Sequence, residues 1–584
     1  MRGWELALGV CWCATAAAAP LKVTVSALPP GAQPVGTSIT FTANATGASS
    51  KTLYMFEYRK SGTTAWQKIE ALWYAKTLRW TLLQEGSYQL LAYAYDPSTK
   101  ASGQAIANVQ FTSRASGGQP VVSPTAHPLV FLYSAPPCSG SVTATYAPLG
   151  SSTLQATPTY NCNGSATVNF YLAGLLANTT YTAQQQGGPV LTFTTGTPTI
   201  PVDTSYVILQ PPDANTCEQQ PILLGDKGGS NYASAVDLAG NLLWYYQYAP
   251  KSNAQGTYWV RPAPDQSGNQ FFILGTVSSG SQLLTESDLA GNTVWSTSVP
   301  AVNRQLATNL QASWLSHDAV RLPNGHTLTL ASVERLYQNV QGVNGTVDIV
   351  GDIILDLDSN MNVAWLWSSF DNLNINQTAI LGEVCTTAQN CGGPLHLAAT
   401  ANDWTHASFL LYRPADGNII LGLKSQDLIL KIDYANGTGD GHIVWQLGQA
   451  GDFALGQNSV ASTWPWFSHM HDMEPTITDN TYTLMDNGDT RVAAQGGDSR
   501  GQVWELDEVN LVATLQLNVD LGAYSKGSGS SAQLDNGNYY WQLVNPQQQT
   551  EFMELLPSTA LDFEAQRGGP ATRLFRMASM YSVQ

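Results

Sequence analysis

The chain has 584 residues and a formal net charge of −17, with 25 Lys and Arg against 42 Asp and Glu. This acidic balance excludes most nucleic-acid-binding proteins, which need basic side chains to neutralise phosphates. Because 43% of the residues are hydrophobic and 10% are aromatic, the composition excludes a disordered chain and predicts two to four folded domains, at about 100–200 residues each.

Residues 1–19 have the composition of a secretory signal peptide. Arg2 precedes an apolar run over residues 6–12, and small residues follow over 14–19. This order is typical of a segment that directs export. A loose lipoprotein box at residues 8–11 is the alternative. No later segment approaches 18 consecutive apolar residues, so we expect no further membrane span and an exported protein, periplasmic or extracellular.

The cysteines beyond the signal predict disulfide bonds, since an exported chain meets oxidising conditions. Two pairs are close enough in sequence to staple a small domain and a short loop, Cys138 with Cys162 and Cys385 with Cys391. Cys217 is then left over. None of these spacings fits a zinc finger.

Residues 20–113 and 118–198 predict two small β-sandwiches. In the first, short alternating runs at 38–42, 53–59, 79–83 and 88–95 are separated by Gly, Pro and Ser clusters, which is typical of sandwich strands. In the second, the stretch L-L-A-N-T-T-Y, which ends at Tyr181, resembles the end-of-domain corner of fibronectin type III modules. There the tyrosine hydroxyl bonds back to nearby backbone.

From residue 199 to 584 an irregular repeat appears. Its unit ends in an acidic turn, an apolar strand and a Trp, as in D-L-A-G-N-L-L-W, which ends at Trp244, and D-L-A-G-N-T-V-W, which ends at Trp295. Six units begin near Gln220, Tyr258, Ser316, Asp403, Ser468 and Ser525. Each unit is long enough for four short strands, so the fold class is all-β with a six-bladed β-propeller after the two sandwiches. A linear β-solenoid is the alternative.

Three units begin with a histidine before the first strand. The starts read S-H-D-A-V-R-L with His317, T-H-A-S-F-L-L with His406 and H-M-H-D-M-E-P with His471. Because equivalent positions of propeller blades converge on the axis, we expect the three imidazoles to face one another at the mouth of the central channel. The alternative is that each histidine only caps its own blade through backbone hydrogen bonds.

Three clustered histidines suit either a catalytic metal or covalent catalysis. The metal alternative stays open, although Asp318 and Asp472 follow their histidines directly and so point to the opposite strand face. A neutral imidazole is also a nucleophile toward sulfur or phosphorus, and a cation would stabilise the anionic oxygens. Lys424 is the candidate cation, on the strand after His406, with a solvated surface lysine as the alternative.

Several ordered blocks around these residues resemble the bacterial aryl-sulfate sulfotransferase family, which does not use the nucleotide sulfate donor. The blocks are D-W-T-H-A-S (403–408), L-K-S-Q-D (423–427), F-S-H-M-H-D (467–472), M-D-N-G-D (485–489) and L-F-R-M-A-S-M-Y (574–581). The family's fold is a six-bladed propeller with a small β-domain. The resemblance covers residues 200–584.

The resemblance implies that His471 is the histidine that becomes transiently sulfated, and that His317 and His406 are two further active-site histidines. The sequence departs from the family at Ser408, where Asn is usual, and at Lys424, where Arg is usual. Met470 likewise stands in place of Gln. Lys keeps the charge but lacks the fork that matches two sulfate oxygens.

We therefore expect a sulfotransferase that moves a sulfuryl group from an aryl sulfate to a phenol through sulfohistidine, in ping-pong order. Lys424, His317 and His406 would hold the sulfuryl oxygens, Ser408 would add a hydrogen bond, and Trp466 would stack on the aryl ring. No cofactor and no metal is required. The rivals are a surface propeller that binds glycans or protein partners, and an aryl sulfate hydrolase. The oligomeric state is open, with a homo-oligomer as one option.

Overall fold

The computed structural model describes residues 19–201, 203–218, 222–226, 232–247, 254–263, 270–277, 282–387, 393–577 and 579–581. All of the expected signal peptide except Ala19 lies outside these ranges, as does Cys391. The described part of the chain is all-β, as the sequence predicts. Its only α-helices are short: α1 (Val299–Asn303), α2 (Ser369–Asn372) and α3 (Asp489–Gln495). Within these ranges, no helix has the length and apolar character to span a membrane.

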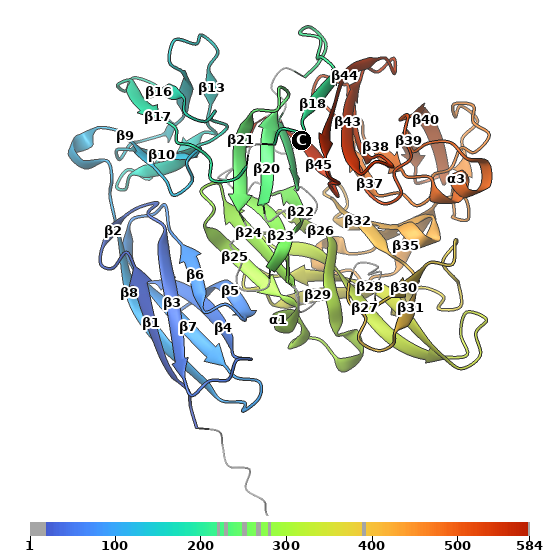
Figure 1. Ribbon diagram of the computed structural model, residues 1–584, viewed down its shortest axis with the longest axis horizontal. Helices are drawn as coiled ribbons and strands as arrows, with labels where there is room; N and C mark the ends of the chain where they lie inside the picture. The colour runs from blue at the N-terminus through green and yellow to red at the C-terminus, as the bar shows by residue number, and fades with distance from the viewer. Residues whose placement is uncertain are drawn as a thin grey trace, which may run out of the picture.

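The N-terminal unit has two layers of strands (Figure 1). One sheet has the order β1-β3-β6, and the facing strands have the order β2-β8-β7-β4-β5. Buried aromatic side chains such as Phe41, Trp80 and Phe111 lie in one core. The strands are β1 (Lys22–Leu28), β2 (Gln33–Pro34), β3 (Ile39–Thr46), β4 (Leu53–Lys60), β5 (Gln67–Trp73), β6 (Thr77–Trp80), β7 (Gly86–Tyr95) and β8 (Ser102–Thr112).

Three of the four runs expected in this unit coincide with β3, β4 and β7. The run expected at 79–83 is shifted, because β6 ends at Trp80. β1 and β8 were not anticipated as strands. Their exposed and half-exposed residues alternate without full burial of one face, which weakens the period-2 hydrophobic signal.

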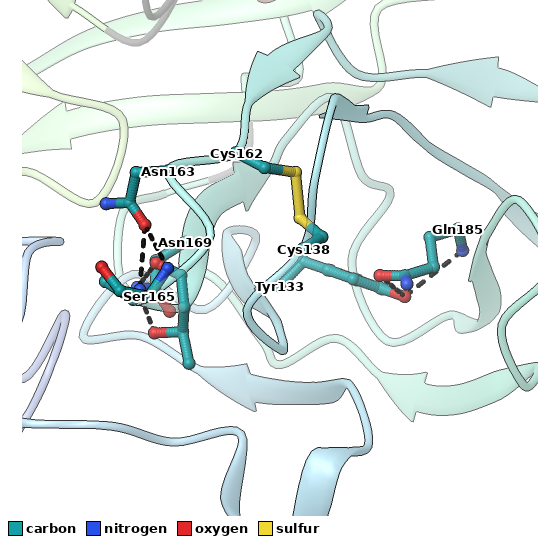
Figure 2. The surroundings of a disulfide bond; sticks show 9 residues. Tyr133, Cys138, Cys162, Asn163, Ser165, Asn169 and Gln185 are labelled. Atoms are coloured by element: carbon teal, nitrogen blue, oxygen red, sulfur yellow. Dashed lines mark hydrogen bonds between the residues drawn. A yellow bond between two sulfur atoms is a disulfide. The ribbon is translucent and has the colours of Figure 1, made fainter.

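The second unit contains the predicted disulfide bond between Cys138 and Cys162, with an S–S distance of 2.04 Å (Figure 2). The backbone N–H of Leu176 donates to the Tyr181 hydroxyl at 2.9 Å, which is the corner bond that the sequence predicts. The strands are β9 (Val121–Pro124), β10 (Phe131–Ala135), β11 (Ser141–Val142), β12 (Ala144–Pro148), β13 (Gln155–Ala156), β14 (Tyr160–Asn161), β15 (Val168–Leu172), β16 (Thr180–Gln185) and β17 (Leu191–Thr194). They form the sheets β15-β10-β9, β11-β14 and β13-β12-β16-β17.

The described residues beyond 199 form six antiparallel sheets whose starts match the six sequence units. The main strands of successive sheets are β19 (Ile222–Asp226), β20 (Tyr232–Asp237) and β21 (Leu242–Gln247); β22 (Ala254–Pro262), β23 (Gln270–Val277), β24 (Gln282–Asp288) and β25 (Thr293–Ser298); β26 (Ala312–Arg321), β27 (Thr327–Gln338), β28 (Thr346–Leu357) and β29 (Val363–Ser368); β32 (Ala407–Arg413), β33 (Asn418–Leu423), β34 (Leu428–Ile432) and β35 (Ile443–Leu447); β37 (Asp472–Pro475), β38 (Thr481–Asp486), β39 (Arg500–Asp507) and β40 (Val512–Asp520); β41 (Ser530–Gln533), β42 (Tyr539–Val544), β43 (Gln549–Leu555) and β44 (Leu561–Gly568).

The six sheets follow one another around a common centre (Figure 1). The strands β19, β22, β26, β32, β37 and β41 contact one another in this order, and β41 contacts β45 (Leu574–Met577). β45 pairs with β19 and so completes the first sheet, while β18 (Val207–Gln210) pairs with β44 in the last sheet. The chain thus closes the cycle from both of its ends, and the first sheet is not built from four consecutive strands as the sequence repeat suggests.

Short strands extend two of the described sheets. β30 (Val384–Thr386) and β31 (Thr400–Asp403) extend the sheet of β28, and β36 (Ala454–Leu455) lies beside β40. Cys385, in β30, is disulfide-bonded; its predicted partner, Cys391, is outside the described residues. Cys217 is buried, and its thiol donates to Oε2 of Glu554 at 3.3 Å.

The repeated acidic turn has a structural reason. In D-L-A-G-N the carboxylate of Asp237 accepts the backbone N–H groups of Ala239 and Asn241, so the turn is closed by its own side chain. In two units the Trp bonds to the turn region of the next sheet: the Trp244 indole N–H donates to the Leu289 carbonyl at 2.8 Å, and that of Trp365 donates to the Gly439 carbonyl at 3.0 Å. In these units the turn and the Trp join neighbouring sheets.

The N-terminal units are continuous with the cycle of sheets. β5 pairs in parallel with β25 at Ser296 and Glu70, so the first unit extends the second sheet edge to edge. One hydrophobic core includes Phe131 of the second unit together with Trp244 and Tyr581. The two N-terminal units therefore pack against the cycle of sheets.

Candidate functional site

The histidine-bearing segments enter the centre through an unusual backbone. His317, His406 and His469 have positive φ angles of 51°, 46° and 51°, a region that residues other than Gly rarely adopt. His317 lies inside a register shift between Ser316 and Ala319. By backbone conformation, the counterpart of His317 and His406 in the third unit is thus His469, and His471 lies two residues further on.

The imidazoles of His317, His406 and His471 nevertheless lie together. The His317 ring centroid is 4.9 Å from that of His406 and 6.3 Å from that of His471. His317 and His471 are 7% and 2% exposed, and the His406 side chain is 18% exposed. His317 and His406 are themselves the left-handed residues of their segments, whereas His471 lies two positions after the left-handed His469. The His471 ring therefore reaches the same centre from a different backbone conformation.

The hydrogen bonds of two rings fix where their protons lie. Nδ1 of His471 is 3.0 Å from the carbonyl oxygen of Gly529, which directly precedes β41. Because a carbonyl only accepts, Nδ1 carries the proton and Nε2 keeps its lone pair. Nδ1 of His406 is 2.6 Å from Oδ2 of Asp403, so a positive charge on His406 would be matched by a carboxylate.

Burial makes two of the imidazoles neutral. Desolvation lowers the pKa of His471 well below its usual value, and the nearby charges of Arg573 and Lys424 add to that effect. Desolvation also lowers the pKa of His317, with contributions from His406 and His471. A neutral imidazole with a free Nε2 lone pair is the nucleophilic form.

Lys424 lies beside this cluster, although not on the expected strand. β33 ends at Leu423, and Lys424 begins a 3-10 turn (Lys424–Gln426) whose first N–H donates to the His406 carbonyl at 3.1 Å. Its Nζ is 3.6 Å from Oδ2 of Asp489, and the Tyr524 hydroxyl donates to the other oxygen of that carboxylate at 2.9 Å. The cation is therefore 12% exposed and partnered, not a solvated surface lysine.

Ser408 and Trp466 have other partners in the structure. The Ser408 hydroxyl is buried and donates to the Met470 carbonyl at 2.8 Å. The Trp466 ring stacks on Trp504, with centroids 5.1 Å apart, inside a hydrophobic core. Their expected roles in hydrogen bonding and aryl stacking stay predictions.

Two residues next to the cluster were missed from the sequence. Arg573 is 3% exposed and bonds to the carbonyls of Ser408 and His471. His469 is buried between Asp427, at 2.7 Å, and Glu383. His469 is visible as the neighbour of His471 in F-S-H-M-H-D, whereas no local pattern marks Arg573, which is more than 100 residues away in sequence.

The clustered imidazoles differ from the groups that could hold a metal ion in the described part of the chain. Those groups are Cys217 with Glu554 and Asp562, and Asp433 with Asp440 and His442. Asp318 and Asp472, which follow the histidines, lie against Arg573 instead, at 2.9 and 3.6 Å. A cavity of about 710 Å³ lies elsewhere, between the second unit and the first sheet, with Tyr146 and Asp237 among its lining residues.

Comparison with known proteins places the chain in a family. The family model Arylsulfotransferase (ASST) matches residues 190–552, which is more than half of the chain. The chain belongs to the arylsulfotransferase family.

The other comparisons add little. No curated protein matches the chain. Two solved structures of Parabacteroides merdae β-glucuronidase, one with glycerol in its active site, match at 11% and 12% identity over 31% of this chain and 24% of the other. Their TM-score is 0.14, which carries no argument about fold or function.

Proposed function

We propose that the protein is an exported six-bladed propeller enzyme that transfers a sulfuryl group from an aryl sulfate to a phenol, with His471 as the nucleophile. The observation that carries the proposal is the buried imidazole of His471. Its proton is held on Nδ1 by Gly529, and its pKa is lowered by burial and by the charges of Arg573 and Lys424. The ring is therefore neutral and has a free Nε2 at neutral pH.

The architecture supports this proposal at the level of the whole fold. Six antiparallel sheets in a closed cycle are what a propeller requires, and the two layered N-terminal units fit sandwiches of the immunoglobulin and fibronectin type III kind. The disulfide between Cys138 and Cys162 supports an oxidising compartment, as expected for an exported protein.

The first half-reaction follows from the positions of the three rings and Lys424. Nε2 of His471 attacks sulfur, the bond between sulfur and the aryl oxygen breaks, and its electron pair leaves on that oxygen. His406, whose imidazolium would be balanced by Asp403, gives the proton that makes the leaving group a neutral phenol. Lys424 and His317 hold the sulfuryl oxygens, where charge is spread in a loose transition state.

The second half-reaction reverses these roles. The acceptor phenol gives its proton to His406 while its oxygen attacks the sulfur of sulfohistidine. The bond between sulfur and Nε2 breaks, and its electrons return to the imidazole of His471. The left-handed backbone at His317 and at His406 costs about 1–3 kcal/mol each. Strain of this kind at two histidines of one cluster fits a catalytic site.

The test is turnover of a chromogenic aryl sulfate with phenol as acceptor. We expect His471→Ala to abolish transfer and Lys424→Met to lower kcat/KM by roughly 10²–10³-fold. His442→Ala and Lys526→Met, which change exposed residues, should leave activity unchanged. Radiolabelled sulfate should be trapped on His471 when no acceptor is present.

Three outcomes would contradict the proposal in different ways. Full activity of His471→Ala would remove the nucleophile from the mechanism. Release of phenol at full rate without any acceptor would indicate a hydrolase. Absence of all turnover by the wild type, with retention on a glycan array, would indicate a binding propeller.

A further inference from the structure

Arg573 joins the three segments that carry the clustered histidines. Its Nη2 donates to the carbonyls of Ser408, at 2.5 Å, and His471, at 2.9 Å, while its Nη1 bonds to Oδ2 of Asp318 at 2.9 Å. Asp318 adjoins His317, and Ser408 lies two residues after His406. One guanidinium therefore contacts β26, β32 and the residue that precedes β37.

The two carbonyls are available because the segments are irregular there. Ser408 lies inside a register shift between Ala407 and Phe409, and a bulge leaves one residue out of the ladder. His471 precedes the first paired residue of β37. Backbone carbonyls buried without a partner are costly, so Arg573 stabilises the irregular backbone on which the histidines depend.

The charge of Arg573 is balanced by two carboxylates. Asp318 pairs with both Arg573 and Arg261, and Asp472 is 3.6 Å from Arg573. A planar guanidinium can serve two carbonyls and a carboxylate at the same time, which an ammonium group cannot do with the same geometry. The charged and titratable groups that face or adjoin His471 are His317, His406, Lys424, Asp472 and Arg573.

We propose that Arg573 is a positioning residue for His471, tying the three histidine-bearing segments together and setting the electrostatic surroundings of the nucleophile. This inference rests on the proposed function. Of the charges around His471, that of Arg573 has the largest effect in lowering its pKa. Arg573 directly precedes β45, the strand that completes the first sheet, so closure of the cycle delivers it to the site.

The experiment separates charge from geometry with two variants. Arg573→Met removes both the charge and the hydrogen bonds. The pKa of His471, and with it the acidic limb of the pH profile of kcat/KM, should therefore rise by roughly one pH unit. In the same variant kcat should fall by about 10²-fold. Arg573→Lys keeps the charge, so it should leave the acidic limb in place and still lose about 10-fold or more in kcat. Arg576→Met is the matched control, because Arg576 is equally buried but pairs with Glu554.

The pKa of His471 is read by NMR of ring-labelled histidines, which needs no turnover. If the wild type proves inactive, the proposed function fails while the titration still tests Arg573. If Arg573→Met folds and the pKa of His471 is unchanged, the claim that Arg573 sets the electrostatic surroundings of His471 is overturned. If Arg573→Lys keeps the wild-type kcat, the claim that Arg573 positions His471 is overturned. This second test holds even when Arg573→Met does not fold.

Discussion

His469 and His471 are two residues apart, yet their surroundings hold them in opposite charge states. Burial disfavours the charged form of both rings. At His469 the hydrogen bonds to Asp427 and Glu383 outweigh burial and raise its pKa to about 9, whereas His471 faces cations and a carbonyl. His469 has a left-handed backbone with φ of 51°, so the segment is not extended there. One ring meets the carboxylates, and the other meets the site.

The charge of His469 predicts a pH-dependent stability. A folded pKa raised above the usual 6.5 contributes stability that is fully present below about pH 6.5 and is lost as the pH rises through 9. His469→Gln should lower the free energy of unfolding at pH 6 by on the order of 3 kcal/mol, and the difference from wild type should shrink above pH 9. Thermal melts from pH 6 to 10 measure this.

The control for that measurement is His442→Gln, because the His442 side chain is 62% exposed and screened by solvent. It should melt like the wild type at every pH. A constant difference between His469→Gln and wild type over the whole range would mean that His469 contributes packing and not charge.

At the scale of the element, one sequence motif is used in two environments. D-L-A-G-N occurs at 237–241 and at 288–292. Asn241 is exposed and Asp237 is half-buried, whereas Asp288 and Asn292 are both buried. The Tyr171 hydroxyl of the second unit donates to Asp288 at 2.6 Å, and the Ser38 hydroxyl of the first unit donates to Asn292 at 2.5 Å. The second copy is thus both a turn and a docking point.

This difference predicts unequal costs for the same substitution. Asp288→Ala leaves Tyr171 and the Asn292 amide without their acceptor inside the protein, and should lower the free energy of unfolding by about 2–4 kcal/mol. Asp237→Ala loses only an exposed turn and should cost about 0.5–1 kcal/mol. Melting temperatures of the two variants compare them directly, and equal losses would contradict a docking role for Asp288.

At the scale of the whole molecule, the C-terminal end fastens the second unit to the cycle of sheets. The Tyr581 hydroxyl accepts the Ala173 N–H at 2.8 Å and donates to the Tyr171 carbonyl at 2.9 Å, and it lies 3.2 Å from the Tyr146 hydroxyl. All of these groups are buried. A single hydroxyl therefore links residues more than 400 positions apart.

Removal of that hydroxyl should loosen the attachment. In Tyr581→Phe the amide and carbonyl lose their partner, so we expect a loss of about 1–3 kcal/mol and faster hydrogen exchange at the Ala173 amide. Tyr74→Phe, at a side chain that is 49% exposed, is the control. Unchanged exchange at Ala173 would show that apolar packing alone holds the second unit.

The sequence by itself determined what is local in this protein. Strand periodicity and the D-L-A-G-N turns predict the all-β class and the starts of the six sheets, because a turn is closed by its own side chains. The close spacing of Cys138 and Cys162 predicts their disulfide. The blocks around His406, Lys424 and His471 indicate the sulfotransferase family, since each block is a short segment that can be read on its own.

Only the tertiary structure decided what depends on contacts between distant segments. The partners of His469, the burial of Asp288 and the hydrogen bond from Arg573 to the His471 carbonyl all depend on residues far apart in sequence. The first sheet is completed by β45, from the other end of the chain. Periodicity and spacing describe one segment at a time, whereas burial and charge at a site are sums over every segment that packs there.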